Sequence, residues 1–136
     1  MLSYRHFNYL IESKIDIDGH THKFVVDPMY DDEHTTLKSI PTHKIEQSFK
    51  NDIHYYVSKS GENSKQSKHR YEGFKEFLRS KPKEVHASSL HIHDDGKVSF
   101  NNGRHRYAVM RDAGVSHIPV SLSKESLKNA KQHGYV

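Results

Sequence analysis

The segment Val98–Val120 reads VSFNNGRHRYAVMRDAGVSHIPV and predicts a strand, a tight turn, a helix and a second strand in succession. Its first residues alternate between apolar and polar, which is the period of a half-buried strand. The run Asn101–Gly103 supplies the backbone freedom that a sharp turn into a helix requires. We expect a helix over Arg104–Ala113, with Gly114 as its left-handed stop. Ile118–Val120 predicts a short strand, whose proline is typical of a first residue or an edge.

The first turn of this predicted helix carries Arg104, His105 and Arg106 in succession. Free backbone N–H groups and the helix dipole favour an anion at such a position, whereas cations oppose the dipole. A phosphate bound between the cations would make the arrangement favourable, and guanidinium groups match phosphate oxygens bidentately. We predict a phosphate site at Asn102, Gly103, Arg104 and Arg106. Pairing of the two arginines with Asp112 or other surface carboxylates is the alternative.

The run Asn102–Tyr107, followed by Ala108, Gly114 and Ile118–Val120, resembles the signature of the ParB/sulfiredoxin superfamily. In that superfamily a Gly-x-(His/Arg)-Arg turn opens a helix and binds the phosphates of a nucleotide or nucleic acid. The resemblance covers about residues 70–122 and implies that His105 and Arg106 face the site.

Two departures from the superfamily narrow what the resemblance implies. Sulfiredoxins carry their catalytic cysteine immediately before the His-Arg pair, where this chain has Arg104. The chain contains no cysteine at all, which excludes sulfinic acid reduction. About 16 residues follow Val120, so we expect no helix-turn-helix domain of the kind that ParB partition proteins carry.

Length and composition indicate one small domain. The chain has 136 residues with a hydrophobic content of 33%, so its core must be small. The net charge of +4 and the 13 histidines favour a polyanionic partner such as nucleic acid. The lack of cysteine fits a reducing compartment, and no apolar run is long enough to cross a membrane, so we expect a cytoplasmic protein. The order of the elements predicts the α+β class: a small mixed sheet with three to four helices.

Apolar periodicity predicts the remaining elements of the chain. Phe7, Tyr9 and Ile11 share one face of a strand that forms a hairpin with the Phe24–Val26 strand. A helix with Thr42 as N-cap carries one apolar stripe. The stripe consists of Ile45, Phe49, Ile53, Tyr56 and Val57. Further helices are expected over Tyr71–Leu78 and after Ser123, which is a good N-cap.

Two further groups of residues are candidates for ligand binding. Residues 58–69 contain no apolar side chain and predict a flexible basic loop that follows a nucleic-acid backbone or, as the alternative, a solvated linker. The candidate cations are Lys59, Lys65, Lys68, Arg70 and Lys97. In the hairpin predicted over 90–98, His91 and His93 share one strand face, and with Asp94 they form a candidate metal site. Ordinary polar surface is the alternative, as it is for the acidic run Tyr30–His34.

Three functions from different classes remain open. The first is a DNA nuclease or nickase, in which Arg104 and Arg106 stabilise the scissile phosphate, His105 acts as acid or base, and Mg²⁺ or Mn²⁺ assists. The second is an ATP- or CTP-dependent phosphotransferase or switch. The third is a non-catalytic module that binds nucleic acid or a partner protein. The basic charge and the lysine-rich segment favour the first.

Overall fold

The computed structural model describes residues 14–136, and the predicted strand with Phe7, Tyr9 and Ile11 lies outside them. Within this range the strands are β1 (Lys14–Ile17), β2 (His20–Val25), β3 (Thr36–Pro41), β4 (Val85–His86), β5 (Ser88–Ile92), β6 (Val98–Asn102) and β7 (His117–Leu122). The helices are α2 (Thr42–Phe49), α3 (Lys65–Arg79), α4 (Arg104–Asp112) and α5 (Lys124–Gln132). Two short 3₁₀ helices cover Pro28–Tyr30 (η1) and Lys59–Gly61 (η2). The predicted α+β class is confirmed.

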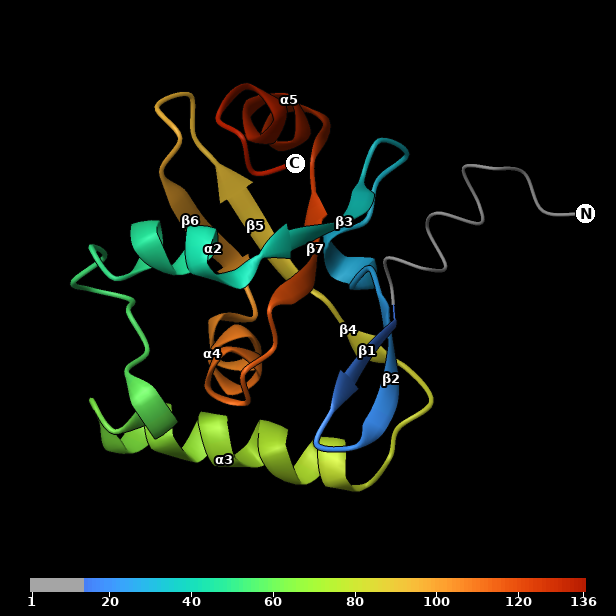
Figure 1. Cartoon of the computed structure of the whole chain (residues 1–136), viewed down its shortest axis with the longest axis vertical. Helices are drawn as coiled ribbons and strands as arrows, with labels where there is room; N and C mark the ends of the chain where they lie inside the picture. The colour runs from blue at the N-terminus through green and yellow to red at the C-terminus, as the bar shows by residue number, and fades with distance from the viewer. Residues whose placement is uncertain (1–13) are drawn as a thin grey trace, which may run out of the picture.

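The strands form two small mixed sheets instead of the single sheet that we predicted. One sheet has the order β1-β2-β4, and the other has the order β3-β7-β5-β6. The N-terminal region forms an antiparallel hairpin of β1 and β2, but its first strand is Lys14–Ile17 and not the predicted strand with Phe7, Tyr9 and Ile11, which lies outside the described residues. Only Ala87 separates β4 from β5, and its N–H donates to the Val25 carbonyl at 2.8 Å. One extended segment therefore contributes to both sheets (Figure 1).

The helices surround the four-stranded sheet. Helix α2 contacts β3 and β6, and α5 contacts β5 and β7. Helix α4 contacts β5 and also packs on α3, so it lies between α3 and the sheet (Figure 1). In α5, Ser123 is the N-cap as predicted, and Ala130 is fully buried. This arrangement holds the start of α4 at the end of β6, where the candidate phosphate site is expected.

The strand-turn-helix-strand unit over residues 98–122 is confirmed, with one correction at Pro119. We predicted a first residue or an edge, but Pro119 is the third residue of β7, which lies between β3 and β5. Pro119 pairs with Ser39 of β3, whereas the pairing with β5 begins only at Val120. The proline is therefore flanked by one strand, a local environment that tolerates a residue without an N–H group.

The predicted helix over residues 42–57 is wrong in its second half. Helix α2 ends at Phe49, and Ile53 is 86% exposed instead of buried. Asp52 Oδ1 accepts the amides of His54 and Tyr55, at 3.2 and 3.0 Å, and turns the chain away from the helix axis. Tyr56 and Val57 reach the core from this irregular segment. Pro41, not Thr42, is the N-cap.

The predicted flexible loop over residues 58–69 is also wrong. Its first part forms η2, and α3 begins at Lys65, six residues earlier than expected. Ser64 is the N-cap, and its hydroxyl accepts the amide of Ser67 at 3.0 Å. Three of the four candidate cations in this region, Lys65, Lys68 and Arg70, therefore have fixed helical positions.

An aromatic cluster forms the part of the core beneath the predicted site. Phe49 is fully buried, and its ring centroid lies 4.8 Å from that of Phe100, 5.6 Å from that of Tyr107 and 5.1 Å from that of Tyr56. These rings come from α2, the segment after it, β6 and α4. The cluster therefore fixes the start of α4 relative to the sheet.

Candidate functional site

The turn at Gly103 connects β6 directly to α4. Gly103 has φ +87°, and a Cβ added to it would lie 2.7 Å from both Arg106 Nη2 and Ser88 Oγ. The Ser88 hydroxyl donates to the Gly103 carbonyl at 2.7 Å, and Asn102 Nδ2 donates to Asp27 Oδ2 at 3.1 Å. This position therefore requires glycine both for its backbone conformation and for the close approach of its neighbours.

A cleft of about 630 Å³ opens beside this turn. Helix α4 contributes its first turn, β6 its last residues, α3 one arginine and the segment after α2 two side chains. The lining residues are Asp52, Tyr55, Arg70, Ser99, Phe100, Asn101, Asn102, Gly103, Arg104, His105 and Arg106. The structure thus brings every predicted phosphate ligand to one cleft, which is large enough for a phosphate group.

Arg104 and Arg70 are the accessible cations of the cleft. Arg104 Nη1 donates to the Tyr55 carbonyl at 3.2 Å, and its guanidinium lies 5.3 Å from the centroid of the Tyr55 ring. Within residues 14–136, no carboxylate forms an ion pair with Arg104 or Arg70. The alternative partner Asp112 is already bound to Arg111, with Nε 2.9 Å from Oδ1. Both guanidinium groups are therefore available to an anion.

Arg106 lies deeper than Arg104. Its Nε and Nη2 atoms are buried and have no hydrogen-bond partner in the described part of the chain. Burial lowers the pKa of Arg106, although Asp27 and Tyr30 act against this shift. A buried donor without an acceptor is costly. The guanidinium lies against Gly103, so a bound anion at the turn would relieve this cost most directly.

His105 is held in the interface between α3 and α4. It is 8% exposed, and its Nε2 lies 3.0 Å from the hydroxyl oxygen of Ser67. Burial lowers the pKa of His105 to about 4, and the nearby guanidinium groups of Arg104 and Arg70 add to this shift. The imidazole is therefore neutral at neutral pH and a weak proton acceptor, which favours a structural role over the acid or base role that we predicted.

The lowered pKa of His105 predicts a loss of stability in mild acid. The unfolded chain takes up this proton near pH 6.5 and the folded chain only near pH 4. The free energy of unfolding should therefore fall as the pH decreases from 6.5 towards 4, with a contribution from His105 of up to about 3 kcal/mol. Urea unfolding at a series of pH values measures this change. The decrease in the free energy of unfolding should be smaller in His105→Gln than in the wild type.

The control for this measurement is His34→Gln. The side chain of His34 is 57% exposed and pairs with the exposed Glu33, so its replacement should change the free energy of unfolding by less than about 1 kcal/mol. Burial also lowers the pKa of His22, so part of the decrease remains in both variants. An unchanged pH dependence in His105→Gln would contradict the assignment.

The structure separates the other predicted nucleic-acid contacts from the cleft. Lys59 lines a different cleft, of about 320 Å³, between the β1–β2 hairpin and α3. Lys68 pairs with Glu62 at 3.4 Å, and Lys65 lies outside the cleft on the exposed surface of α3. Lys97 lines a third cleft that adjoins the first. Of the five candidates, Arg70 is the one that faces the predicted phosphate site.

The candidate metal ligands are brought together only in part. The rings of His91 and His93 lie side by side, 4.3 Å between centroids. Asp94 instead accepts a hydrogen bond from Asn129 at 3.2 Å, and His93 Nε2 lies 3.0 Å from Ser99 Oγ. Within residues 14–136, no three His, Cys, Asp or Glu side chains form a group that could hold a metal ion. The predicted three-residue set is therefore not assembled.

The acidic run near residue 30 forms an exposed turn. Asp32 Oδ1 accepts the amide of His34 at 2.8 Å and the Thr35 hydroxyl at 3.0 Å. These hydrogen bonds lower the pKa of Asp32. The carboxylate thus has a local structural role in the turn.

Five residues of the cleft are not among the predicted site residues: Ser99, Phe100 and Asn101 of β6, and Asp52 and Tyr55 of the segment after α2. The sequence pattern places Asp52 and Tyr55 in a continuous helix, outside its apolar stripe. Asp52 is the sequence signal that could have indicated their position. An aspartate side chain often accepts hydrogen bonds from backbone amides two or three residues later, and this pattern is typical of a turn. Their position in the cleft depends on the helix ending at Phe49.

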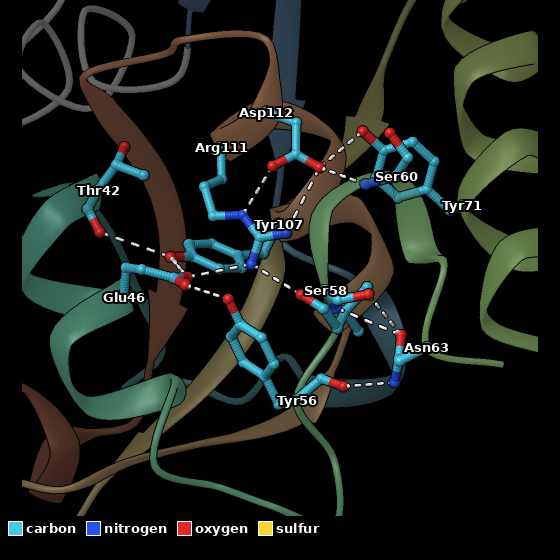
Figure 2. Close-up of polar contacts among 11 residues, drawn as sticks. Thr42, Glu46, Tyr56, Ser58, Ser60, Asn63, Tyr71, Tyr107, Arg111 and Asp112 are labelled. Atoms are coloured by element: carbon cyan, nitrogen blue, oxygen red, sulfur yellow. Dashed lines mark hydrogen bonds and ion pairs between the residues drawn. The ribbon is translucent and has the colours of Figure 1, made fainter.

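A buried polar network lies behind the cleft and joins α2, α3 and α4 (Figure 2). Glu46 accepts hydrogen bonds from Tyr107 at 2.8 Å, Tyr56 at 2.6 Å and Arg111 at 3.1 Å. Asp112 accepts from Arg111 at 2.9 Å, from Tyr71 at 2.8 Å and from the amide of Ser60 at 2.9 Å. This network holds the segment that carries Tyr55 against α4.

No protein-family model matches the sequence, and neither curated proteins nor solved structures gave a significant match. Each helix within residues 14–136 is too short or too polar to span a membrane. The function must therefore be inferred from the residues of the cleft and their chemistry.

Proposed function

We propose that the protein binds DNA by holding a backbone phosphate in the cleft at Gly103. The observation that carries the proposal is that Arg104 and Arg70, which have no carboxylate partner within residues 14–136, line one cleft together with the start of α4. Cations on both sides of the backbone N–H groups at a helix start form a site suited to an anion. The net charge of +4 supports a polyanion as the partner.

The start of α4 adds donors to this site. No side chain caps the helix, and Tyr107 is the first residue whose amide donates within it, to the Gly103 carbonyl at 3.0 Å. Within residues 14–136 the three preceding amides have no acceptor, so they can bind phosphate oxygens. The buried guanidinium of Arg106 adds positive charge beneath the turn. A phosphate here would receive both hydrogen bonds and charge compensation.

The proposal predicts that Arg104→Ala weakens DNA binding by about 10-fold or more, since a hydrogen bond to a charged group contributes about 1.5–3 kcal/mol. Fluorescence anisotropy with a labelled oligonucleotide at low salt measures this change. Affinity should also fall steeply as the salt concentration rises, because phosphate contacts release counterions.

The matched control for this experiment is Arg79→Ala. It removes the same charge from an exposed position of α3 that is paired with Glu76 and lies outside the cleft. Its affinity should stay within about 3-fold of the wild type, since an exposed pair contributes little. Equal losses in both variants would mean that general electrostatics, and not a defined site, binds the DNA.

Phosphodiester cleavage is a second candidate function, and Asp52 is the observation that favours it. Asp52 is the single carboxylate among the residues that line the cleft. It replaces His105 as the candidate for activating a water molecule, because the neutral, buried imidazole is a weak base. Nicking of supercoiled plasmid with Mg²⁺ or Mn²⁺, lost in Asp52→Asn and Arg104→Ala, is the expected result. If the wild type leaves the supercoiled plasmid intact, cleavage is excluded and DNA binding is the remaining function.

The proposed function is consistent with a ParB/sulfiredoxin-like phosphate turn, which we retain as a proposal. It is supported by the run Asn102–Arg106 and by the strand, left-handed glycine and helix that carry it. ATP or CTP remains the alternative source of the phosphate.

A further inference from the structure

Tyr55 is an exposed aromatic residue that lines the phosphate cleft. Tyr55 is 62% exposed, and Ile53 beside it is 86% exposed. The backbone of Tyr55 is nevertheless held in place, because Asp52 Oδ1 accepts its amide and Arg104 donates to its carbonyl. A large exposed ring with a fixed backbone is typical of a binding surface and not of a core.

The ring and the cations of the cleft have complementary chemistry. The Arg104 guanidinium lies near the Tyr55 ring, 5.3 Å from its centroid, and Arg70 lines the same cleft. An aromatic ring provides a surface for a nucleobase, and guanidinium groups bind the phosphate that is covalently linked to that base. The cleft therefore offers a place for each half of a nucleotide.

We propose that the cleft binds single-stranded nucleic acid, with an unpaired base stacked on Tyr55 and the adjoining phosphate at Arg104 and Arg70. This inference rests on the proposed phosphate-binding function and names its substrate class. Bases in a duplex are already stacked on their neighbours, so they are not available to the ring.

A strand fits the site better than a free nucleotide does. Pockets for small molecules usually enclose most of the ligand surface, whereas Tyr55 leaves more than half of its own surface open to solvent. The third cleft, which Lys97 lines, has a volume of about 640 Å³ and shares Asp52 and Ser99 with the phosphate cleft. The binding groove therefore continues beyond the space of one nucleotide.

The test compares a labelled single-stranded oligonucleotide with a duplex of the same length by fluorescence anisotropy. The wild type should bind the single strand more tightly. Tyr55→Ala should weaken this binding by about 10-fold, as expected for the loss of one stacked base. Tyr55→Phe keeps the ring and should bind like the wild type, and duplex binding should be the same in all these proteins.

Phe77→Ala is the matched control, because Phe77 is 45% exposed and lies on α3 outside the cleft. It should leave single-strand binding unchanged. Equal affinity for both DNA forms and no effect of Tyr55→Ala would overturn the inference. If Arg104→Ala still weakened binding in that case, the phosphate site would stand. Tyr55-dependent binding of ATP or CTP that the oligonucleotide does not compete for would also overturn it, in favour of a free nucleotide.

Discussion

Replacement of Arg111 by methionine is expected to lower the free energy of unfolding by about 3–5 kcal/mol. The Arg111 side chain is 11% exposed and is bound to two carboxylates, Glu46 and Asp112. Burial alone would lower the pKa of Arg111, but its hydrogen bonds to Asp112 and Glu46 outweigh burial and raise it. Methionine keeps much of the volume but leaves two partly buried carboxylates without their cation. Urea unfolding at neutral pH measures the change.

Arg79→Met is the control for this prediction. Arg79 is paired with Glu76 on the surface, and its side chain is 60% exposed. Its replacement should change the free energy of unfolding by less than about 1 kcal/mol. A similar small change in Arg111→Met would show that water or the remaining tyrosine donors compensate the carboxylates, and that the network does not hold the segment with Tyr55.

Phe49→Ala is expected to lower the free energy of unfolding by about 3–5 kcal/mol, as for other buried phenylalanines. The ring is fully buried and contacts Tyr56, Phe100 and Tyr107. Alanine would leave a cavity among rings that belong to three different parts of the chain, so the surroundings cannot close around it easily. Urea unfolding of the variant and of the wild type measures this difference.

The exposed Phe77 provides the comparison, since Phe77→Ala removes the same atoms from a ring that is 45% exposed. Its cost should be about 1 kcal/mol or less, because little apolar area returns to water. The loss of unfolding free energy in Phe49→Leu should lie between the losses in Phe49→Ala and Phe77→Ala. Equal costs for Phe49→Ala and Phe77→Ala would contradict the central position of Phe49 in the core.

The parts of the fold that were predicted correctly are those whose signals are local. The turn at Gly103 and the helix stop at Gly114 both require a left-handed backbone that glycine adopts readily, and both have positive φ angles. The N-cap at Ser123 can be predicted from its residue type, because a serine hydroxyl can accept an amide of the first helical turn. The same local reading identified Arg104 and Arg106 as cleft residues, because they lie in the first turn of a helix that was correctly located.

The errors arose where distant contacts override local patterns. The apolar stripe through Ile53 suggested one long helix, but Tyr56 leaves the helix and donates to Glu46 across the core. The buried pair of Glu46 and Arg111 joins residues 65 positions apart, so no local pattern indicates it. The polar segment 58–64 is ordered because Ser60 donates its amide to Asp112. Such partners become visible only in three dimensions.

The segment shared by the two sheets gives the β1–β2 hairpin a structural role. Strand β2 pairs with β4 in parallel, covering the backbone of Val85 and His86. Without the hairpin, this part of the chain would present unpaired N–H and C=O groups next to the buried Val85 side chain. Exposed strand edges of this kind serve as templates for pairing between molecules. The hairpin thus pairs one side of β4 and moves that edge of the sheet outward to β1, quite apart from any ligand that the cleft binds.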